Sequence, residues 1–201
     1  MIKEMKALSI TSSYAGFLYE GFAARVLAAG RAPSSGLVLM KARDETTFFV
    51  PAGSNPDTTV NPFSRAREKS YAFFSAHPRA LDLEVDPKKP LVAYFWKLMA
   101  PNNPLFDAFI IEFETSDRTL HAIVWILQMT LSTNHGGGSS EGYQLIDLIK
   151  TKAMSMSRSP LKVGKVTVKY VLVSPTAGEW KLPKTNWKLY KGDVYYQRVD
   201  Y

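Results

Sequence analysis

Two apolar segments separated by a short polar stretch constrain the fold of this chain more than any other feature. Residues 106–113 and 120–132 are each long enough for a strand, and their spacing predicts an antiparallel β-hairpin. Polar residues mark the same end of both segments: Asp107 opens the first, and Gln128 and Thr130 close the second. A polar group in a buried strand is costly unless it is paired or used. We therefore predict a functional site at this end of the hairpin.

Strand geometry predicts which of these side chains share a face. A turn centred at residues 116–117 would pair Asp107 with a residue near Ile126 and make Gln128 the diagonal neighbour on the same face, roughly 7–8 Å away between backbones. Glu112 lies five residues from Asp107, so the two-residue period of a strand directs it to the opposite face. The pattern therefore pairs Asp107 with Gln128 and excludes Glu112.

The residue types at this end predict a metal-ion site. The Asp107 carboxylate and the Gln128 amide oxygen are hard donors, which suit Mg²⁺ or Mn²⁺ and are poor ligands for zinc. Such an ion would polarise a phosphodiester and generate a hydroxide nucleophile. Thr130, on the same face, and His135, in the glycine-rich stretch that follows, complete the candidate catalytic set. A purely structural interpretation stays open, in which Asp107 caps a turn and Gln128 satisfies a backbone group.

The rest of the chain alternates between helical and extended patterns. Helices are predicted over residues 11–29, 64–76 and 143–156. Strands are predicted at 37–41, 46–50, 166–173 and 193–199, loops at 54–62 and 134–142, and either type at 91–99. This order predicts an α/β fold with a mixed central sheet, formed as one domain over residues 1–201.

The charge of the chain favours a polyanionic partner. The formal net charge is +7 and the isoelectric point is about 9.5, and both fit nucleic acid. Basic residues concentrate in the part from about 150 to 201. The lysines expected to contact nucleic acid are Lys150, Lys152, Lys165 and Lys169. The alternative, that these lysines form the solvated face of a sheet, stays open.

Several classes of protein are disfavoured by what the sequence lacks. There are no cysteines, which excludes disulfides, thiolate nucleophiles and zinc–cysteine sites. There is no apolar stretch of membrane-spanning length and no visible signal peptide. We therefore expect no membrane association and a location inside the cell, with a nuclear location left open. The motifs of nucleotide-hydrolysing loops, serine hydrolases and zinc proteases are absent.

Six short segments, taken in chain order, point to one family. They are residues 11–30 with Leu-Tyr-Glu at 18–20, residues 94–101, residues 103–109 (Asn-Pro-Leu-Phe-Asp-Ala-Phe), residues 127–132 (Leu-Gln-Met-Thr-Leu-Ser), His135, and residues 193–197 (Asp-Val-Tyr-Tyr-Gln). Together they resemble the nuclease-like C-terminal domains of Crinkler and retrotransposon-hot-spot proteins. The similarity touches most of the chain.

The resemblance implies a restriction-endonuclease-like fold of the Asp…(Asp/Glu)-x-Lys type. It would place Glu20 on the first helix, Asp107 on the first strand of the hairpin and Gln128 on the second, around one metal ion. Taken from the residues alone, Glu20 has another interpretation. It lies beside the apolar positions of its helix, where it could simply face solvent.

The chain departs from the motif of that superfamily at two positions. Thr130 stands where the motif has lysine, and a neutral hydroxyl cannot offset charge that builds on a phosphate. Gln128 stands in place of a carboxylate, which weakens metal affinity. His135 could substitute as a base or phosphate contact, or Lys150 or Lys152 could reach the site from the following helix.

Two hypotheses follow from these observations. In the first, the chain is a divalent-metal-dependent nuclease with Mg²⁺ or Mn²⁺ at its site and DNA as the expected substrate. In the second, it is a degenerate relative of the same fold that binds nucleic acid or protein without catalysis. Retention of Glu20, Asp107 and Gln128 favours the first, and loss of the motif lysine favours the second.

Overall fold

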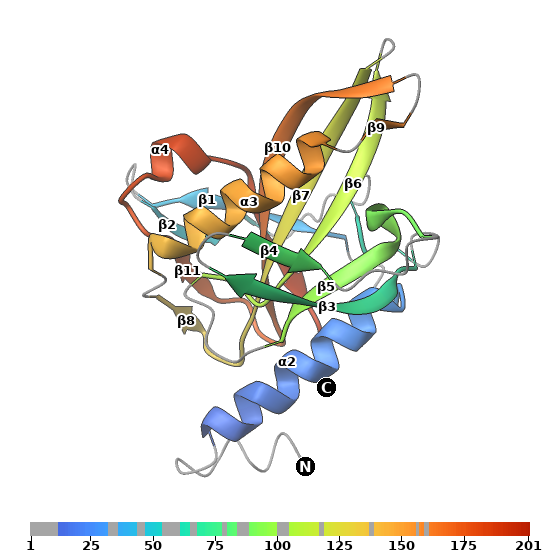
Figure 1. Cartoon of the computed structure of the whole chain (residues 1–201). Helices are drawn as coiled ribbons and strands as arrows, with labels where there is room; N and C mark the ends of the chain where they lie inside the picture. The colour runs from blue at the N-terminus through green and yellow to red at the C-terminus, as the bar shows by residue number, and fades with distance from the viewer. Residues whose placement is uncertain are drawn as a thin grey trace.

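Helices lie on both faces of one large mixed β-sheet (Figure 1). The computed structural model describes residues 12–31, 36–43, 47–53, 61–64, 68–77, 80–83, 89–99, 105–116, 119–136, 139–155, 157–158 and 161–201. One hydrophobic core contains residues of helix α2 (Ser12–Ala28), and the other contains residues of helix α3 (Glu141–Ser155). The fold is therefore mixed α/β, with a large sheet and few helices, as the sequence predicts.

Both long helices confirm sequence predictions, and α2 ends as its sequence indicates. Gly30 has a left-handed φ of 63°, a conformation that glycine adopts without strain. The N–H of Gly30 donates to the carbonyl of Leu27 (3.1 Å) and that of Arg31 to the carbonyl of Val26 (3.0 Å). This is the double hydrogen bond of a Schellman C-cap. The part of the chain that the structure describes also contains the 3₁₀ turn η3 (Leu91–Ala93) and the short helix α4 (Trp187–Tyr190).

Within the described ranges, twelve strands form the sheet. They are β1 (Val38–Ala42), β2 (Phe48–Pro51), β3 (Ser70–His77), β4 (Ala80–Leu83), β5 (Tyr94–Leu98), β6 (Ala108–Ser116), β7 (Thr119–Met129), β8 (Asn134–His135), β9 (Ser157–Arg158), β10 (Leu161–Ser174), β11 (Glu179–Lys181) and β12 (Val194–Arg198). Their order across the sheet is β4-β3-β5-β6-β7-β10-β12-β1-β2-β11-β8, and β9 pairs with β10 beside this path.

The centre of the sheet mixes antiparallel and parallel pairing. Strands β5, β6 and β7 form an antiparallel meander, and β10 and then β12 add in parallel to β7. Parallel neighbours need a crossover connection, and α3 supplies it between β7 and β10. The predicted hairpin, the following helix and the last two long strands are therefore confirmed as elements.

Strand β7 explains why the second apolar segment is so continuous. Trp125 and Leu127 belong to the core on the α2 side, whereas Val124 and Ile126 belong to the core on the α3 side. Since successive side chains point to opposite faces, a strand covered on both faces needs apolar residues at every position.

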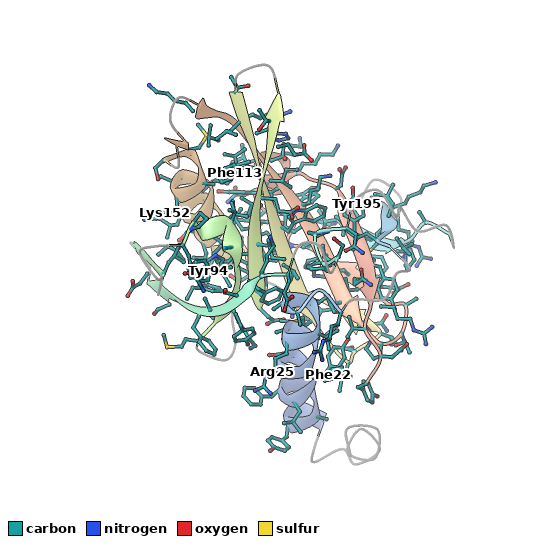
Figure 2. All side chains as sticks on the ribbon, turned by 90° about the vertical axis from the view of Figure 1, so that its right-hand side faces the viewer. Phe22, Arg25, Tyr94, Phe113, Lys152 and Tyr195 are labelled. Carbon is teal, nitrogen blue, oxygen red and sulfur yellow. The ribbon has the colours of Figure 1, made fainter. Side chains whose placement is uncertain are left out.

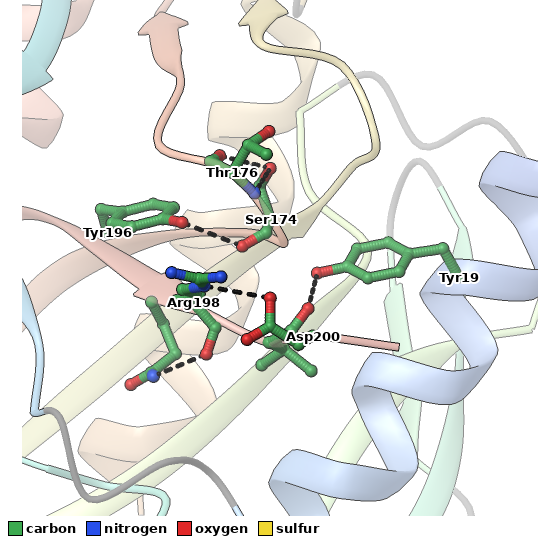
Figure 3. Close-up of polar contacts among 8 residues, drawn as sticks. Tyr19, Ser174, Thr176, Tyr196, Arg198 and Asp200 are labelled. Atoms are coloured by element: carbon green, nitrogen blue, oxygen red, sulfur yellow. Dashed lines mark hydrogen bonds and ion pairs between the residues drawn. The ribbon is translucent and has the colours of Figure 1, made fainter. Parts of the chain in front are cut away.

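The C-terminal strand holds α2 against the sheet through a group of polar contacts that we call the C-terminal network (Figure 3). The Tyr19 hydroxyl donates to the carbonyl of Val199 (3.1 Å). The Tyr196 hydroxyl donates to the carbonyl of Ser174 (3.1 Å), and the Ser174 hydroxyl donates to the carbonyl of Thr176 (2.8 Å). The Tyr19 bond ties α2, the helix that carries Glu20, to the chain just after β12, and the other two bonds join β12, β10 and the turn after β10.

One predicted helix is wrong. The chain from Ser70 to His77 is strand β3, not part of a helix over residues 64–76, and residues 65–67 lie outside the described chain. Ala72 and Phe74 are buried, while Tyr71 and Phe73 are exposed, which is the two-residue period of a strand. The alternation is hidden in the sequence because the exposed positions also carry large apolar side chains.

Three other predicted segments can be compared with the structure in so far as their residues are described. Residues 91–99 become the η3 turn followed by β5. The predicted loop over 134–142 is wrong at both ends, because Asn134 and His135 pair with β11 as strand β8, and Glu141 and Gly142 belong to α3. Most of the predicted loop over 54–62 lies outside the described residues. None of the described helices is long and apolar enough to cross a membrane.

Candidate functional site

The register of the β6–β7 hairpin places Asp107 opposite Gln128. The pairing runs from Ser116 with Thr119 to Ala108 with Leu127, so the next position outward joins Asp107 to Gln128. The predicted register, with Asp107 facing Ile126, is therefore wrong. The turn lies one residue later than predicted, and Gln128 is the direct rather than the diagonal neighbour.

The Asp107 carboxylate accepts two short hydrogen bonds just beyond the last paired residues of β6 and β7. The Gln128 amide Nε2 donates to Asp107 Oδ2 (2.7 Å), and the Met129 backbone N–H donates to the same oxygen (2.7 Å). The Asp107 N–H donates to the carbonyl of Leu127 (2.9 Å). No described residue makes a hydrogen bond to Oδ1. The carboxylate thus completes the hydrogen bonding of the strand end with one oxygen and keeps the other available.

Helix α2 brings a second carboxylate to the same place. Burial and then the negative charge of Glu20 raise the pKa of Asp107 to about 7, while the Met129 hydrogen bond and the positive charge of Lys97 oppose the shift. Burial also raises the pKa of Glu20, and Lys97 again opposes the shift. Two carboxylates therefore share one cation in a partly desolvated environment, which disfavours ionisation of both.

Sequence reasoning missed Lys97. It lies on β5, where it pairs with Ala108, and the N–H of the next residue, Leu98, donates to the Asp107 carbonyl (2.9 Å). A signal was present, because Lys97 is the single charged residue in the apolar segment 94–99. The cost of burying a polar group applies to it as it does to Asp107. We call Glu20, Lys97, Asp107 and Gln128 together the Asp107 cluster.

Two other predicted catalytic residues have different surroundings. The Thr130 hydroxyl accepts the Ser132 N–H (3.0 Å), which makes it part of the turn after β7. His135 lies in β8 opposite Trp180 of β11, and burial lowers its pKa. Among the described residues, no hydrogen bond or ion pair joins Thr130 or His135 to Asp107.

Glu112 stays apart from Asp107, as its parity in the strand predicts. Its carboxylate accepts the Trp125 indole N–H (3.0 Å) and lies 3.8 Å from the Lys69 ammonium.

The four lysines predicted to contact nucleic acid do not form one patch. Lys150 and Lys152 are on α3, which packs across the sheet from α2, whereas Lys169 lies over the rings of Trp125 and Tyr195 on the α2 side, 5.1 Å and 5.6 Å from the ring centres. Lys165 shares the strand face of Lys169 by the two-residue period. Figure 2 shows Lys152 and Tyr195 on opposite sides of the sheet.

Two of these lysines also have acidic partners. Lys150 lies 3.5 Å from Asp147, and Lys169 lies 3.9 Å from Asp193. Lys97 is the cation whose charge lowers the pKa values of both Glu20 and Asp107.

The ligands available to a metal ion are few. Glu20 and Asp107 supply carboxylates, and Gln128 could add its amide oxygen only by turning over, because its amide nitrogen faces Asp107. Within the described ranges, no group of three or more His, Cys, Asp or Glu side chains is placed to hold a metal ion. The cluster therefore offers two carboxylates and one amide.

Comparisons with known proteins leave the family open. No family model matches the chain, and neither the curated proteins nor the solved structures include a significant match. The function is therefore argued from the Asp107 cluster itself.

Proposed function

We propose that this chain is a divalent-metal-dependent nuclease that hydrolyses phosphodiester bonds, with DNA as its substrate. The observation that carries the proposal is the convergence of Glu20, Lys97 and Asp107 at one end of the hairpin. These residues come from α2, β5 and β6, and Gln128 of β7 contacts Asp107. Acidic side chains beside a cation, in a place where burial shifts their pKa values, are typical of catalytic sites.

The arrangement of elements supports a restriction-endonuclease-like fold for the same proposal. A first helix carries Glu20, an antiparallel meander carries Lys97 and Asp107, and a crossover helix leads to a parallel strand. The two helices cover opposite faces of the sheet. This is the order in which the resemblance places the acidic residues.

The donor set fits a hard divalent cation such as Mg²⁺ or Mn²⁺. Glu20 and Asp107 would hold the ion, since both are oxygen donors, and burial raises the pKa of each carboxyl group. When bound, such an ion polarises a phosphodiester and activates water. Gln128 and the Met129 N–H keep the Asp107 carboxylate in place through Oδ2.

In this proposal Lys97 takes the part of the missing motif lysine. Its ammonium group lies close enough to both carboxylates to lower their pKa values. A cation in this position can offset charge that develops on a phosphate, which the Thr130 hydroxyl cannot do. The proposed lysine therefore lies on β5 and not on the second strand of the hairpin.

One observation favours a second candidate, a non-catalytic binding module of the same fold. The Gln128 amide and the Met129 N–H both donate to Asp107, which gives that carboxylate a structural use at the strand end. A protein that had lost catalysis could retain Asp107 for this reason alone.

Cleavage of supercoiled plasmid in Mg²⁺ or Mn²⁺ separates the two candidates. The proposal expects nicking by the wild type and its loss in Asp107→Asn and in Glu20→Gln. Glu114→Gln is the matched control, because Glu114 is an exposed carboxylate on the same hairpin, distant from Asp107 in the register. No nicking by the wild type with either metal would favour the binding module.

A further inference from the structure

Three exposed aromatic side chains flank the Asp107 cluster. Tyr71 and Phe73 of β3 are 36 % and 42 % exposed, and Phe17 of α2 is 55 % exposed. The rings of Tyr71 and Phe73 meet edge to face, with centres 5.2 Å apart, and Tyr71 stacks on the buried ring of Phe95 at 6.1 Å. We call Phe17, Tyr71 and Phe73 the aromatic strip.

Pairing across the sheet places the strip beside the charged residues. Phe73 of β3 is in register with Lys97 of β5, and Lys97 is in register with Ala108, the residue after Asp107. Neighbouring strands lie about 4.8 Å apart, and in-register side chains share a face. Phe73 therefore presents its ring next to the Lys97 ammonium on the α2 side of the sheet.

Helix α2 runs along β3 in a way that continues this surface. The Lys69 N–H donates to the Ala28 carbonyl (2.9 Å), and the charge of Arg25 acts on the pKa of Tyr71, opposing the rise that burial causes. Four helical residues advance about 6 Å and two strand residues about 6.6 Å. From Arg25 beside Tyr71, this spacing brings Gly21 level with Phe73.

Gly21 borders open space. A methyl group on Gly21 would meet no atom within 4 Å. The first turns of α2, which carry Phe17, extend past the sheet (Figure 1), and this explains why Phe17 is exposed. The surface therefore combines flat apolar rings, an unfilled position at Gly21 and the cations Arg25 and Lys97.

We propose that the aromatic strip binds the unpaired bases of single-stranded nucleic acid, and that single strands are the substrate class of the Asp107 cluster. The inference rests on the proposed nuclease function. Bases stack on exposed aromatic rings without regard to sequence, and nearby cations hold the backbone. A base on Phe73 would bring its phosphate toward Lys97. A duplex cannot bind in this way, because its base faces are already stacked on each other.

Metal-free binding of short oligonucleotides tests the inference. Fluorescence anisotropy in EDTA would compare a labelled single strand of about 12 nucleotides, its duplex, an abasic strand of equal charge, and an RNA strand of the same sequence. The single strand is expected to bind at least tenfold more tightly than the duplex and the abasic strand. The DNA and RNA arms identify which polynucleotide is preferred.

Two variants connect that preference to the strip. Phe73→Leu keeps an apolar side chain but removes the ring, and it is expected to weaken single-strand binding by about tenfold. Gly21→Leu fills the open position beside Phe73 and should weaken binding similarly. Gly16→Leu is the matched control, because Gly16 lies in the same helix, has equally open surroundings and is turned away from β3 by the helical period. It should leave binding unchanged.

The outcomes separate this inference from the proposed function. Equal binding of single strand, duplex and abasic strand would overturn the inference, as would unchanged binding by Phe73→Leu with normal folding by circular dichroism. No binding to any oligonucleotide would also overturn the inference, and the aromatic strip would then be a candidate surface for an apolar partner. The protein could also bind single strands through Phe73 but cleave neither plasmid nor single-stranded circles. That result would support base binding by the aromatic strip and overturn the proposed nuclease function.

Discussion

Two polar regions lie against helix α2, and they differ in the charge and the hydrogen bonding of their polar groups. In the C-terminal network, neutral donors meet carbonyl oxygens: Tyr19 with Val199, and Tyr196 with Ser174. Its charged pair, Arg198 and Asp200, is exposed, at 3.0 Å. In the Asp107 cluster, by contrast, two partly buried carboxylates share one lysine, and both have raised pKa values.

The difference separates structural polar groups from those suited to chemistry. A neutral hydroxyl that meets a carbonyl is satisfied at every pH, so it adds stability and little else. Two carboxylates beside a single cation are not satisfied, and they gain from a proton, a metal ion or a substrate cation. The two regions are adjacent in the fold because Tyr19 and Glu20 are adjacent in α2.

The largest expected effect is on catalysis through Lys97. Lys97→Met should lower the plasmid-nicking rate by about a hundredfold, because it removes the charge that offsets the developing phosphate charge. Lys97→Arg should retain part of the activity. The acidic limb of the pH–rate profile should move to higher pH in Lys97→Met, since Lys97 lowers both carboxylate pKa values.

Lys41→Met serves as the control for Lys97, because Lys41 is an exposed lysine on β1 with no predicted role in the site. Nicking by Lys97→Met at the wild-type rate would show that the cluster does not act as proposed.

A pH-dependent stability difference should distinguish Asp107 from the C-terminal network. The folded-state pKa of Asp107, about 7, lies above the ordinary value for aspartate. Between these two values the folded protein holds a proton that the unfolded chain releases, so stability is present at low pH and is lost as pH rises toward 7. In Asp107→Asn the amide oxygen can still accept the Met129 N–H. The variant has no carboxyl group to titrate at this position, so its stability should not fall in this way as the pH rises toward 7.

The comparison is made by urea denaturation at pH 5 and pH 8. Relative to wild type, Asp107→Asn should gain about 2 kcal/mol in unfolding free energy over this interval, since each unit of pKa shift is worth about 1.4 kcal/mol. Asp200→Asn, in the exposed pair, should show no such gain. A constant difference between Asp107→Asn and wild type at both pH values would contradict the raised pKa.

Metal binding should stabilise the folded protein only through the Asp107 cluster. At a metal concentration of ten times Kd, mass action on the folded state adds about 1.4 kcal/mol. The melting temperature should therefore rise with Mn²⁺ at pH 8 and rise less at pH 5.5, where protons compete for the carboxylates. Scanning calorimetry of wild type and Asp107→Asn checks this, and an equal rise in both would place the metal elsewhere.

The smallest effect is expected in the C-terminal network. Tyr19→Phe removes the hydroxyl that donates to Val199 and should lower the unfolding free energy by about 1 kcal/mol. The nicking rate should stay within twofold of wild type, because Glu20 remains on a helix still packed by the Tyr19 ring. A larger loss of nicking than of stability would show that this hydrogen bond positions Glu20.

Much of the hairpin end could be predicted because its polar residues interrupt long apolar segments. Asp107 and Gln128 stand out in the sequence, and their contact needs only the two-residue period and an approximate turn. The register was one residue off, since the turn position depends on local contacts that the sequence pattern does not fix. α2 was predictable from its spacing and from Gly30 at its end.

The surroundings of three residues could not be predicted from the sequence: Lys97, Thr130 and His135. The segment around Lys97 fitted either a helix or a strand, so its face could not be assigned. The two-residue period predicts Thr130 on the face of Gln128, and the glycine-rich stretch and the resemblance suggest His135. The chain changes direction after Met129, where the Thr130 hydroxyl enters a local turn and His135 joins β8. Partners from other strands require the sheet order, which periodicity alone does not supply.

The hydrogen bond between Tyr19 and Val199 spans 180 residues of chain, and this separation sets an order of events during synthesis. The residue that anchors α2 follows the helix from the ribosome by about 9 to 36 s at ordinary translation rates. Contacts this distant in sequence form late in folding. The full set of contacts that holds α2, and with it Glu20, can therefore form only after the C-terminal strand has been translated.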